Sequence, residues 1–361
     1  MTADRIARII RRFPESRDRP FPDSLAEAGR VKALVTGVAG FIGSTLAETL
    51  VDAGHEVVGI DCFLDYYPRA IKEGNLASLR AGDRFRFVEA SLVDADLAPL
   101  VDGVDWVFHQ AAQAGVRSSW GEDFRIYSDN NVYATQRLLE ACRAVKGLAK
   151  FVYASSSSIY GDSEALPTRE DATPRPVSPY GVSKLAAEHL AWLYWKNFGL
   201  PTVSLRYFTV YGPRQRPDMA FHRFIHWVMD GEPIVLYGDG EQSRDFTFVA
   251  DIVAANVAAA SSPVAGTVYN LGGGSRTTVN DVIATIGRLV GREPVVDRRE
   301  VQKGDVRHTA ADTTAARRDL GFAPRVTLEQ GLALQVAWQE ERRRQAAATR
   351  RDQESQEKSS R

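Results

Sequence analysis

A tyrosine and a lysine four residues apart, Tyr180 and Lys184 in the segment SPYGVSK, could perform acid–base chemistry. On a helix this spacing places both side chains on one face. A free tyrosine titrates near pH 10 and is a poor base at neutrality, but a neighbouring ammonium stabilises the phenolate and lowers its pKa. Tyr180 could then take the proton of a substrate hydroxyl while hydride leaves the same carbon. Because any helix can supply this spacing by chance, the surroundings of the pair must support the interpretation.

Four consecutive serines, at 155–158, follow an apolar run at 150–154 that is typical of a strand. In open α/β sheets, ligands bind at the carboxyl ends of the strands. A hydroxyl at this position can hold the reacting oxygen and pass its proton toward Tyr180. The alternative is an ordinary serine-rich loop.

A glycine-rich segment, TGVAGFIGS, lies between an apolar run at 31–36 and a helical pattern at 41–53. Gly37 permits a tight turn, Gly40 lets the backbone approach a pyrophosphate, and Gly43 lets the helix pack against the strand. The phosphates would lie at the helix N-terminus, where free N–H groups favour anions. Because the spacing is GxxGxxG rather than GxGxxG, the turn alone is a weak signal.

Asp61 ends a second apolar run, at 55–61, 18 residues after Gly43. A carboxylate there can accept hydrogen bonds from both hydroxyls of a ribose, and it would repel a 2′-phosphate. The sequence therefore predicts tightly bound NAD rather than NADP. The alternative is that Asp61 serves only as a turn residue at the end of a strand.

Apolar runs and helical patterns alternate along most of the chain. Strands are expected at 31–36, 55–61, 84–89, 105–109, 150–154, 202–207 and 267–271, and helices at 41–53, 69–79, 124–145, 179–198, 278–290 and 328–342. Residues 246–260 are expected to form the end of a strand and a helix. This alternation predicts an α/β fold built on a Rossmann-like, doubly wound parallel sheet with helices on both faces. A smaller C-terminal α/β substrate domain is expected to follow it.

The same pattern suggests domain limits. Residues 31–207 would form the NAD-binding domain and 208–335 the smaller substrate-binding domain, with 245–262 returning to the first. Residues 1–30 are rich in Arg, Pro and Asp and read as an N-terminal extension outside the core. Residues 336–361 read as a charged tail in which the last helix frays.

Composition argues against several classes of protein. A net charge of −1 does not indicate a basic surface for binding nucleic acid. The two cysteines are 80 residues apart, a pattern that indicates neither a disulfide framework nor a metal-binding motif. No apolar run approaches membrane-spanning length, and the N-terminal segment does not resemble a secretory signal. We therefore expect a cytoplasmic protein with a small-molecule substrate and no metal, nucleic-acid or membrane partner.

Taken together, these segments resemble the extended short-chain dehydrogenase/reductase family, and within it the nucleotide-sugar 4-epimerases. The resemblance covers roughly residues 31–340, in the motifs TGVAGFIGS, HQAAQAGVRSS, DNNVYATQRLLEA, SSSSIYG, SPYGVSK, RYFTVYGPRQRPDMA, SRDFTFVADIV and KGDVRHTAAD. It implies NAD-dependent epimerisation of a UDP-sugar at C4 through a 4-keto intermediate. Relatives pair through the helices equivalent to 124–145 and 179–198, so the resemblance also implies a homodimer.

The resemblance assigns roles to particular residues. Ser156 matches the catalytic hydroxyl, Tyr180 the base and Lys184 its helper. The implied cofactor contacts are Gly37, Gly40, Phe41, Ile42, Gly43, Asp61, Ala111, Ala112, Gln113 and Asn131, besides Tyr180 and Lys184. The implied substrate contacts are Arg117, Ser156, Ser157, Ser158, Thr209, Arg216, Arg244 and Asp305. Among these, Arg244 would grip the diphosphate and Asp305 the uridine ribose.

Details of these motifs narrow the choice of sugar. The related 4,6-dehydratases carry Asp-Glu where this chain has Ser157 and Ser158, and UDP-glucuronate decarboxylases usually carry Glu at the second position, which disfavours both reactions. The segments TVYGPRQRPDMA and QAGVR resemble UDP-glucuronate 4-epimerases, and Arg216 and Arg117 are candidates to hold a carboxylate. The alternative is that Arg214 and Arg216 are surface charges on a proline-rich loop.

The leading prediction is therefore a UDP-glucuronate 4-epimerase. A UDP-glucose or UDP-N-acetylglucosamine 4-epimerase is the next hypothesis, followed by the decarboxylase. A non-catalytic nucleotide-sugar or NAD-binding protein on the same fold is a further alternative, because a fold alone does not determine function.

Overall fold

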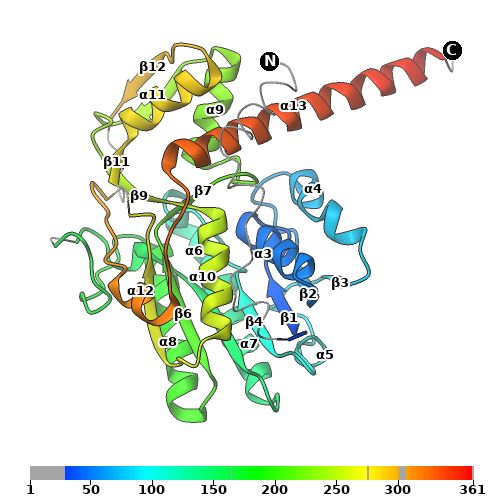
Figure 1. Cartoon of the computed structure of the whole chain (residues 1–361), viewed down its shortest axis with the longest axis vertical. Helices are drawn as coiled ribbons and strands as arrows, with labels where there is room; N and C mark the ends of the chain where they lie inside the picture. Colours follow the sequence, from blue (N-terminus) through cyan, green and yellow to red (C-terminus); the bar gives the residue numbers. More distant parts are fainter. Residues whose placement is uncertain (1–28, 164, 275, 301–305, 360–361) are drawn as a thin grey trace.

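The computed structural model describes residues 29–163, 165–274, 276–300 and 306–359. A parallel sheet of seven strands lies at its centre, in the order β10-β6-β5-β4-β1-β2-β3 (Figure 1). The strands are β1 (Lys32–Thr36), β2 (Glu56–Asp61), β3 (Phe85–Glu89), β4 (Trp106–His109), β5 (Lys150–Ser156), β6 (Thr202–Tyr207) and β10 (Thr267–Leu271). Helices cover both faces of the sheet, so its central strands are buried and apolar along most of their length.

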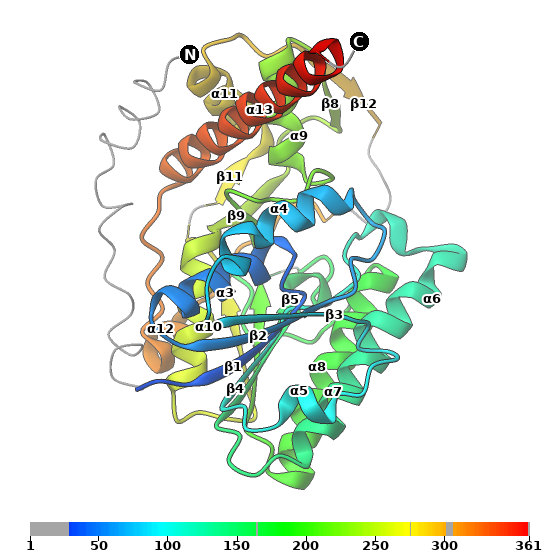
Figure 2. The same cartoon turned by 90° about the vertical axis from the view of Figure 1, so that its right-hand side faces the viewer.

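Two apolar cores flank the sheet. One includes α3 (Phe41–Asp52) and α10 (Val249–Ser261), and the other includes α7 (Ala134–Arg143) and α8 (Pro179–Phe198) (Figure 2). This arrangement confirms the predicted Rossmann-like, doubly wound architecture. The strand order reverses between β1 and β4, and such a reversal opens a crevice at the carboxyl ends of the strands, where ligands bind.

Helix α8 begins and ends where the sequence predicted. Ser178 accepts a hydrogen bond from Gly181 N at 3.1 Å, and Pro179 stands in the first turn. Gly199 ends the helix in the left-handed conformation, at φ 72°. Tyr180 and Lys184 lie in the first turns of this helix, so its cap also fixes their position.

The helix predicted at 124–145 is interrupted. A short helix, α6 (Phe124–Tyr127), leads into a π-helical turn at Ser128–Tyr133 and then into α7. Within this turn the Asn131 side chain bonds to two other segments of the chain. Periodicity alone could not reveal the interruption, because the wide turn depends on contacts that are remote in the sequence.

The remainder of the chain forms a smaller α/β unit beside the large sheet, as predicted (Figure 1). Its strands are β7 (Thr209–Tyr211), β8 (Ile234–Tyr237), β9 (Ser243–Phe248), β11 (Arg276–Thr278) and β12 (Val296–Arg299). Its helices include α9 (Ala220–Asp230), α11 (Val279–Val290) and α13 (Leu328–Ser359), which pack against one another.

Part of the C-terminal half returns to the large sheet. Strand β9 leads directly into α10, which packs against α3 and β5. The return extends beyond the 245–262 range expected from the sequence, because β10 pairs in parallel with β6 and α12 (Thr314–Leu320) packs on β10. A short apolar run does not by itself tell which of two sheets it joins.

Helix α13 continues to Ser359, whereas the sequence analysis expected fraying into a tail. Its second half is rich in Ala, Arg, Gln and Glu, which are strong helix formers. Val336, Ala337 and Gln339 are buried, so the helix is still packed where the predicted tail begins. The predicted extension at 1–30 lies almost entirely outside the described residues. In the described part of the chain, no helix has the length and apolar character needed to cross a bilayer.

Candidate active site

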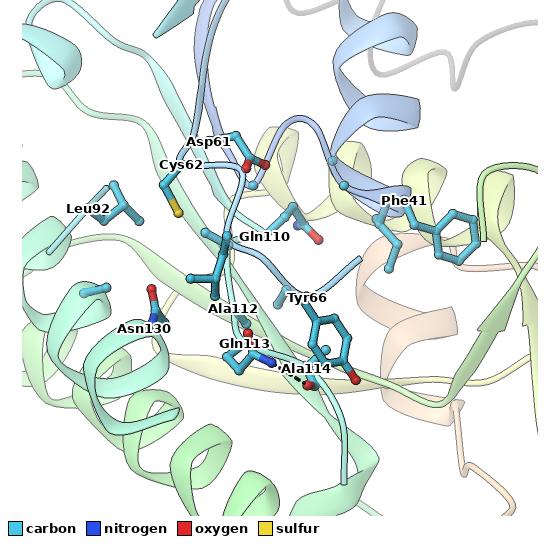
Figure 3. A pocket seen from close by; sticks show the side chains of 18 of the residues that line it. Phe41, Asp61, Cys62, Tyr66, Leu92, Gln110, Ala112, Gln113, Ala114 and Asn130 are labelled. Carbon is cyan, nitrogen blue, oxygen red and sulfur yellow. Dashed lines mark hydrogen bonds between the residues drawn. The ribbon is translucent and has the colours of Figure 1, made fainter. Parts of the chain in front are cut away.

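A cavity lies at the carboxyl ends of the central strands, where the strand order reverses (Figure 3). Its wall is built from the turn after β1, the end of β2, the loop after β4 and the start of α8. Most of the predicted cofactor residues meet there: Gly37, Gly40, Phe41, Ile42, Gly43, Asp61, Ala111, Ala112, Gln113, Tyr180 and Lys184.

The turn after β1 leaves no room for side chains. A Cβ atom on Gly43 would lie 2.3 Å from the carbonyl oxygen of Gly37, and one on Gly37 would lie 2.8 Å from Ala111 Cα. Gly37 also has a φ of 66°, a conformation that residues with side chains rarely adopt. Helix α3 begins at Phe41, so its first N–H groups lie beside the cavity. A main-chain cradle at a helix N-terminus fits a pyrophosphate.

Asp61 lies at the end of β2 beside this turn. Its Oδ2 accepts a hydrogen bond from Ala39 N at 3.0 Å, and its Oδ1 accepts one from Phe63 N at 2.8 Å. Burial raises the pKa of this carboxyl, while the two backbone hydrogen bonds and the Lys72 ammonium oppose the rise. Each carboxylate oxygen has a further lone pair, so Asp61 can accept from a ribose hydroxyl without losing its contacts to the turn.

Lys72 is a cavity residue that the sequence analysis missed. It lies in α4 (Arg69–Arg80), its side chain is buried, and its Nζ is 4.7 Å from the centroid of the Tyr67 ring. Burial lowers its pKa. The sequence did contain a signal, because spacings of 3, 4 and 7 residues place Lys72 on the helical face of three further buried residues: Asn75, Leu76 and Leu79.

Asn131 ties the loop after β4 to helix α8. Its Oδ1 accepts a hydrogen bond from Gln113 N at 2.7 Å, and its Nδ2 donates to Gln113 O at 3.0 Å and to Ser183 Oγ at 2.9 Å. The neighbouring Asn130 lines the cavity (Figure 3). Asn131 thus fixes the main chain of Gln113 relative to the helix that carries Tyr180.

The Ser156 hydroxyl interacts with the side chain of Tyr180. Ser156 Oγ also accepts from Ser158 N at 3.1 Å, which orients the start of the turn after β5. Burial raises the pKa of Tyr180, and the interaction with Ser156 and the charge of Arg216 oppose this rise. The structure therefore brings the predicted hydroxyl near the predicted base.

Lys184 has surroundings that differ from the sequence hypothesis. Its side chain is buried, and its Nζ is 4.5 Å from the centroid of the Tyr153 ring. Burial lowers the pKa of Lys184 to about 7, and Glu188 opposes this change. The sequence hypothesis considered only the charges near Tyr180; burial acts in the opposite direction and raises its pKa, against the effects of Ser156 and Arg216.

The two arginines of the proline-rich loop lie in different environments. Arg214 pairs with Glu48 of α3, with Nη2 2.7 Å from Oε1. Arg216 lines the cavity, pairs with Asp218 and has a side chain that is only 22% exposed. The alternative interpretation of surface charges therefore does not apply to Arg216.

Among the described residues that were predicted to touch the sugar nucleotide, only Arg216 lines this cavity. Arg117 is exposed and its guanidinium carbon is 4.6 Å from the centroid of the Tyr237 ring in β8. Arg244 donates from Nη1 to two main-chain carbonyls, each at 3.0 Å. Asp305 lies outside the described residues. Three further predicted substrate contacts are partly buried: Ser157 and Ser158, which follow Ser156, and Thr209 at the start of β7.

Known proteins match this chain over most of its length. The profile of the family described as "NAD dependent epimerase/dehydratase family" matches residues 33–272. A Bacillus subtilis (strain 168) protein named "Uncharacterized UDP-glucose epimerase YtcB" is 45% identical over 310 residues, which is 85% of this chain and 98% of that protein. A UDP-glucuronate 4-epimerase from Thermodesulfobacterium geofontis (strain OPF15) is 38% identical over 313 residues, 85% of this chain and 96% of the relative.

A solved structure matches as well. UDP-glucuronic acid 4-epimerase from Bacillus cereus, crystallised with UDP-glucuronic acid and NAD, superposes with a TM-score of 0.84 at 43% sequence identity. The match covers 86% of this chain and 99% of that one. The three named relatives are all described as epimerases, and they differ in the sugar that their names give; the Bacillus cereus structure also contains NAD.

Proposed function

The chain belongs to the NAD-dependent epimerase/dehydratase family, and from this premise we propose that it interconverts UDP-glucuronate and UDP-galacturonate. Its reaction class is the NAD-dependent 4-epimerisation of a nucleotide sugar. The choice of glucuronate rests on one observation, the guanidinium of Arg216 in the cavity wall beside Tyr180.

The chemistry of Arg216 supports a uronate. UDP-glucuronate carries a carboxylate on C5, where UDP-glucose carries a neutral hydroxymethyl group. A largely buried guanidinium makes strong, directional hydrogen bonds to a carboxylate. A neutral substituent would leave the same positive charge without a compensating partner from the substrate.

The cofactor side of the cavity fits NAD. The glycine turn would hold the pyrophosphate, Asp61 a ribose, and the loop after β4 the nicotinamide end, through Ala111, Ala112 and Gln113. The charge of Asp61 would repel a 2′-phosphate, which supports NAD over NADP. When bound, NAD accepts hydride from C4 of the sugar and returns it to the opposite face, so it is regenerated in every cycle.

Tyr180 and Ser156 would move the proton. Ser156 holds the C4 oxygen of the sugar, and Tyr180, which interacts with Ser156, takes the hydroxyl proton as C4 becomes a ketone. Because burial raises the pKa of Tyr180, its phenolate depends on nearby positive charge, which Arg216 provides. A protonated Lys184, four residues along the same helix, would add to this charge. The proton returns along the same path after the sugar has turned about its diphosphate.

The carboxylate creates a hazard for this reaction. A 4-keto uronate is a β-keto acid, and it loses carbon dioxide when the breaking bond aligns with the carbonyl π system. Arg216, together with the hydroxyls of Ser157 and Ser158, would hold the carboxylate out of this alignment. This assignment gives Ser157 and Ser158 a role in an epimerase. Acidic side chains at these two positions, as in the 4,6-dehydratases, would instead favour the elimination of water.

UDP-glucose 4-epimerisation is the second candidate. The Bacillus subtilis relative, which is 45% identical, bears that name. In this case the C6 hydroxyl would face the Arg216–Asp218 pair, and the guanidinium would have a structural role only.

The deciding experiment incubates the purified protein separately with UDP-glucuronate and with UDP-glucose, without added NAD, and follows the anomeric protons by NMR. UDP-galacturonate from the first reaction, with little turnover of the second, supports the proposal and a captive cofactor. Turnover of UDP-glucose alone would favour the second candidate. A pentose product would instead indicate a decarboxylase.

We also propose a homodimer. Exposed apolar side chains occur along α6, the π-helical turn and α8: Phe124, Ile126, Tyr133, Val182, Trp192, Leu193 and Phe198. Exposed apolar side chains on adjacent helices are typical of an interface. Light scattering at micromolar concentration should give twice the mass of one chain, and the mass of a single chain would contradict the proposal.

A further inference from the structure

The guanidinium of Arg216 is held by one of its two edges. Its Nε donates to Asp218 Oδ1 at 3.0 Å, and its Nη2 donates to Asp218 Oδ2 at 2.9 Å. These two parallel hydrogen bonds form a bidentate pair across one edge of a planar fork. The second edge, formed by Nη1 and the outer hydrogen of Nη2, points away from Asp218 and can meet another carboxylate.

A tyrosine from a distant segment completes this arrangement. The Tyr66 hydroxyl donates to Asp218 Oδ2 at 3.3 Å, and the Arg216 guanidinium carbon is 5.7 Å from the centroid of the Tyr66 ring. Tyr66 comes from the loop between β2 and α4, and its side chain extends into the cavity (Figure 3). The aromatic ring and the carboxylate together restrict the guanidinium to one orientation.

Further interactions connect Tyr66 to the wall beside the catalytic tyrosine. Tyr66 interacts with Ser118, whose Oγ is 2.9 Å from the hydroxyl of Tyr127. The rings of Tyr127 and Tyr180 are in edge contact, with centroids 6.2 Å apart. A Cβ atom on Gly115 would lie 2.5 Å from the Tyr66 hydroxyl oxygen, so a glycine is required for this tyrosine to lie here.

We propose that Asp218 and Tyr66 are positioning residues that set the selectivity for a uronate. They hold the guanidinium of Arg216 through Nε and Nη2. Its other edge, formed by Nη1 and the outer hydrogen of Nη2, then meets the C5 carboxylate in one fixed geometry. This inference rests on the proposed function, because it assigns Arg216 to that carboxylate. It adds that selectivity depends on two residues that touch Arg216 rather than the substrate.

The test compares the binding of two nucleotides to NAD-containing protein by calorimetry. All variants also carry Tyr180→Phe, so that the ligand is not turned over. Asp218→Asn removes the charge and one acceptor of the bidentate pair, and it should weaken UDP-glucuronate about tenfold while changing UDP-glucose less than twofold. Tyr66→Phe removes only the hydroxyl and should weaken UDP-glucuronate about threefold. Asp218→Glu can still reach Arg216 and should recover part of the loss.

The control variant is Asp171→Asn. Asp171 pairs with Arg169 through the same Nε–Oδ1 and Nη2–Oδ2 contacts, at 3.1 and 3.2 Å, but on the exposed surface. This change should alter the affinity for neither nucleotide. Thermal unfolding of every variant then separates a loss of folding from a loss of positioning.

Product analysis adds a measurement that a merely structural role would not affect. With Tyr180 restored, Asp218→Asn should give more pentose per epimer formed, because a loosely held carboxylate reaches the aligned geometry more often. Equal weakening of both nucleotides, or unchanged affinity for both, would overturn the inference while leaving the proposed function intact. Failure of the parent protein to bind UDP-glucuronate would overturn the proposed function, and this inference with it.

Discussion

The two halves of the cavity are built in different ways. On the cofactor side the main chain forms the wall, at a glycine turn so close that a Cβ on Gly43 would lie 2.3 Å from another backbone atom. On the side that we propose for the sugar, long side chains form the wall, among them Arg216 and Tyr66. Both contact Asp218, and the loops that carry these residues meet only in the folded chain. The shape of the first half is set by main-chain atoms and does not depend on which side chains surround it. The second half is formed by side chains, so a single substitution can change which ligand it binds.

This difference predicts that the two halves fail separately. Changes on the sugar side should alter turnover and selectivity while the protein keeps its NAD. Changes on the cofactor side should lower both cofactor content and stability.

The largest effect is expected for Arg216→Met, which removes the charge from the cavity wall. The catalytic efficiency with UDP-glucuronate should fall about a hundredfold, as for other desolvated charge pairs. NAD content, measured in the denatured protein, should stay unchanged. Arg214→Met is the matched control, because it breaks an ion pair of the same loop that lies outside the cavity wall. An equal loss of catalytic efficiency in both variants would mean that the conformation of the loop is important, rather than the charge of Arg216.

A smaller effect is expected for Gly43→Ala on the cofactor side. The new methyl group must displace the backbone of the turn, so the free energy of unfolding should fall by about 1 to 3 kcal/mol, and bound NAD should fall with it. Gly82→Ala is the control, because a Cβ there would have its nearest neighbour at 3.7 Å. Urea unfolding and cofactor content provide the two measurements. Full NAD content in Gly43→Ala would contradict a main-chain cradle.

Lys184 should make stability depend on pH. Its pKa falls from 10.5 in the unfolded chain to about 7 in the folded protein, so between these values the unfolded state binds more protons. Stability relative to Lys184→Met should therefore rise with pH, by roughly 2 kcal/mol from pH 7 to pH 9. Urea unfolding of both proteins at the two pH values tests this, and a constant difference would show that the lysine stays fully charged when folded.

The smallest effect is expected for Asp61→Asn. The amide keeps one acceptor but loses the charge, so NAD should bind about tenfold more weakly, the size of one charge-assisted hydrogen bond. NADP should be rejected less strongly than by the unchanged protein. Competition between NAD and NADP for protein stripped of its cofactor measures both. An unchanged preference for NAD over NADP would contradict the assignment of this discrimination to the charge of Asp61.

The success of the sequence analysis follows the same division. The turn after β1, the strand that ends at Asp61 and the limits of α8 depend on local features, namely glycines, a capping serine and a proline. Local features can be recognised one residue at a time.

The π-helical turn at Asn131 and the cluster around Arg216 could not be predicted in this way. Tyr66 and Asp218 are 152 residues apart in the chain and meet at 3.3 Å, and no spacing in the sequence relates them. The effect of burial on the pKa of Tyr180 could not be predicted for a similar reason. Burial depends on the whole fold, whereas the presence of Lys184 one turn away was visible in the sequence.

The junction between β9 and α10 has a mechanical consequence. Phe248 ends the strand and Val249 begins the helix, so no flexible linker separates the small sheet from the helix that packs on α3 (Figure 1). The chain therefore passes from the small sheet into α10 without a break, and α10 in turn contacts α3, whose first turn lines the cavity. The small unit and this wall of the cavity are thereby joined through two packed helices in series.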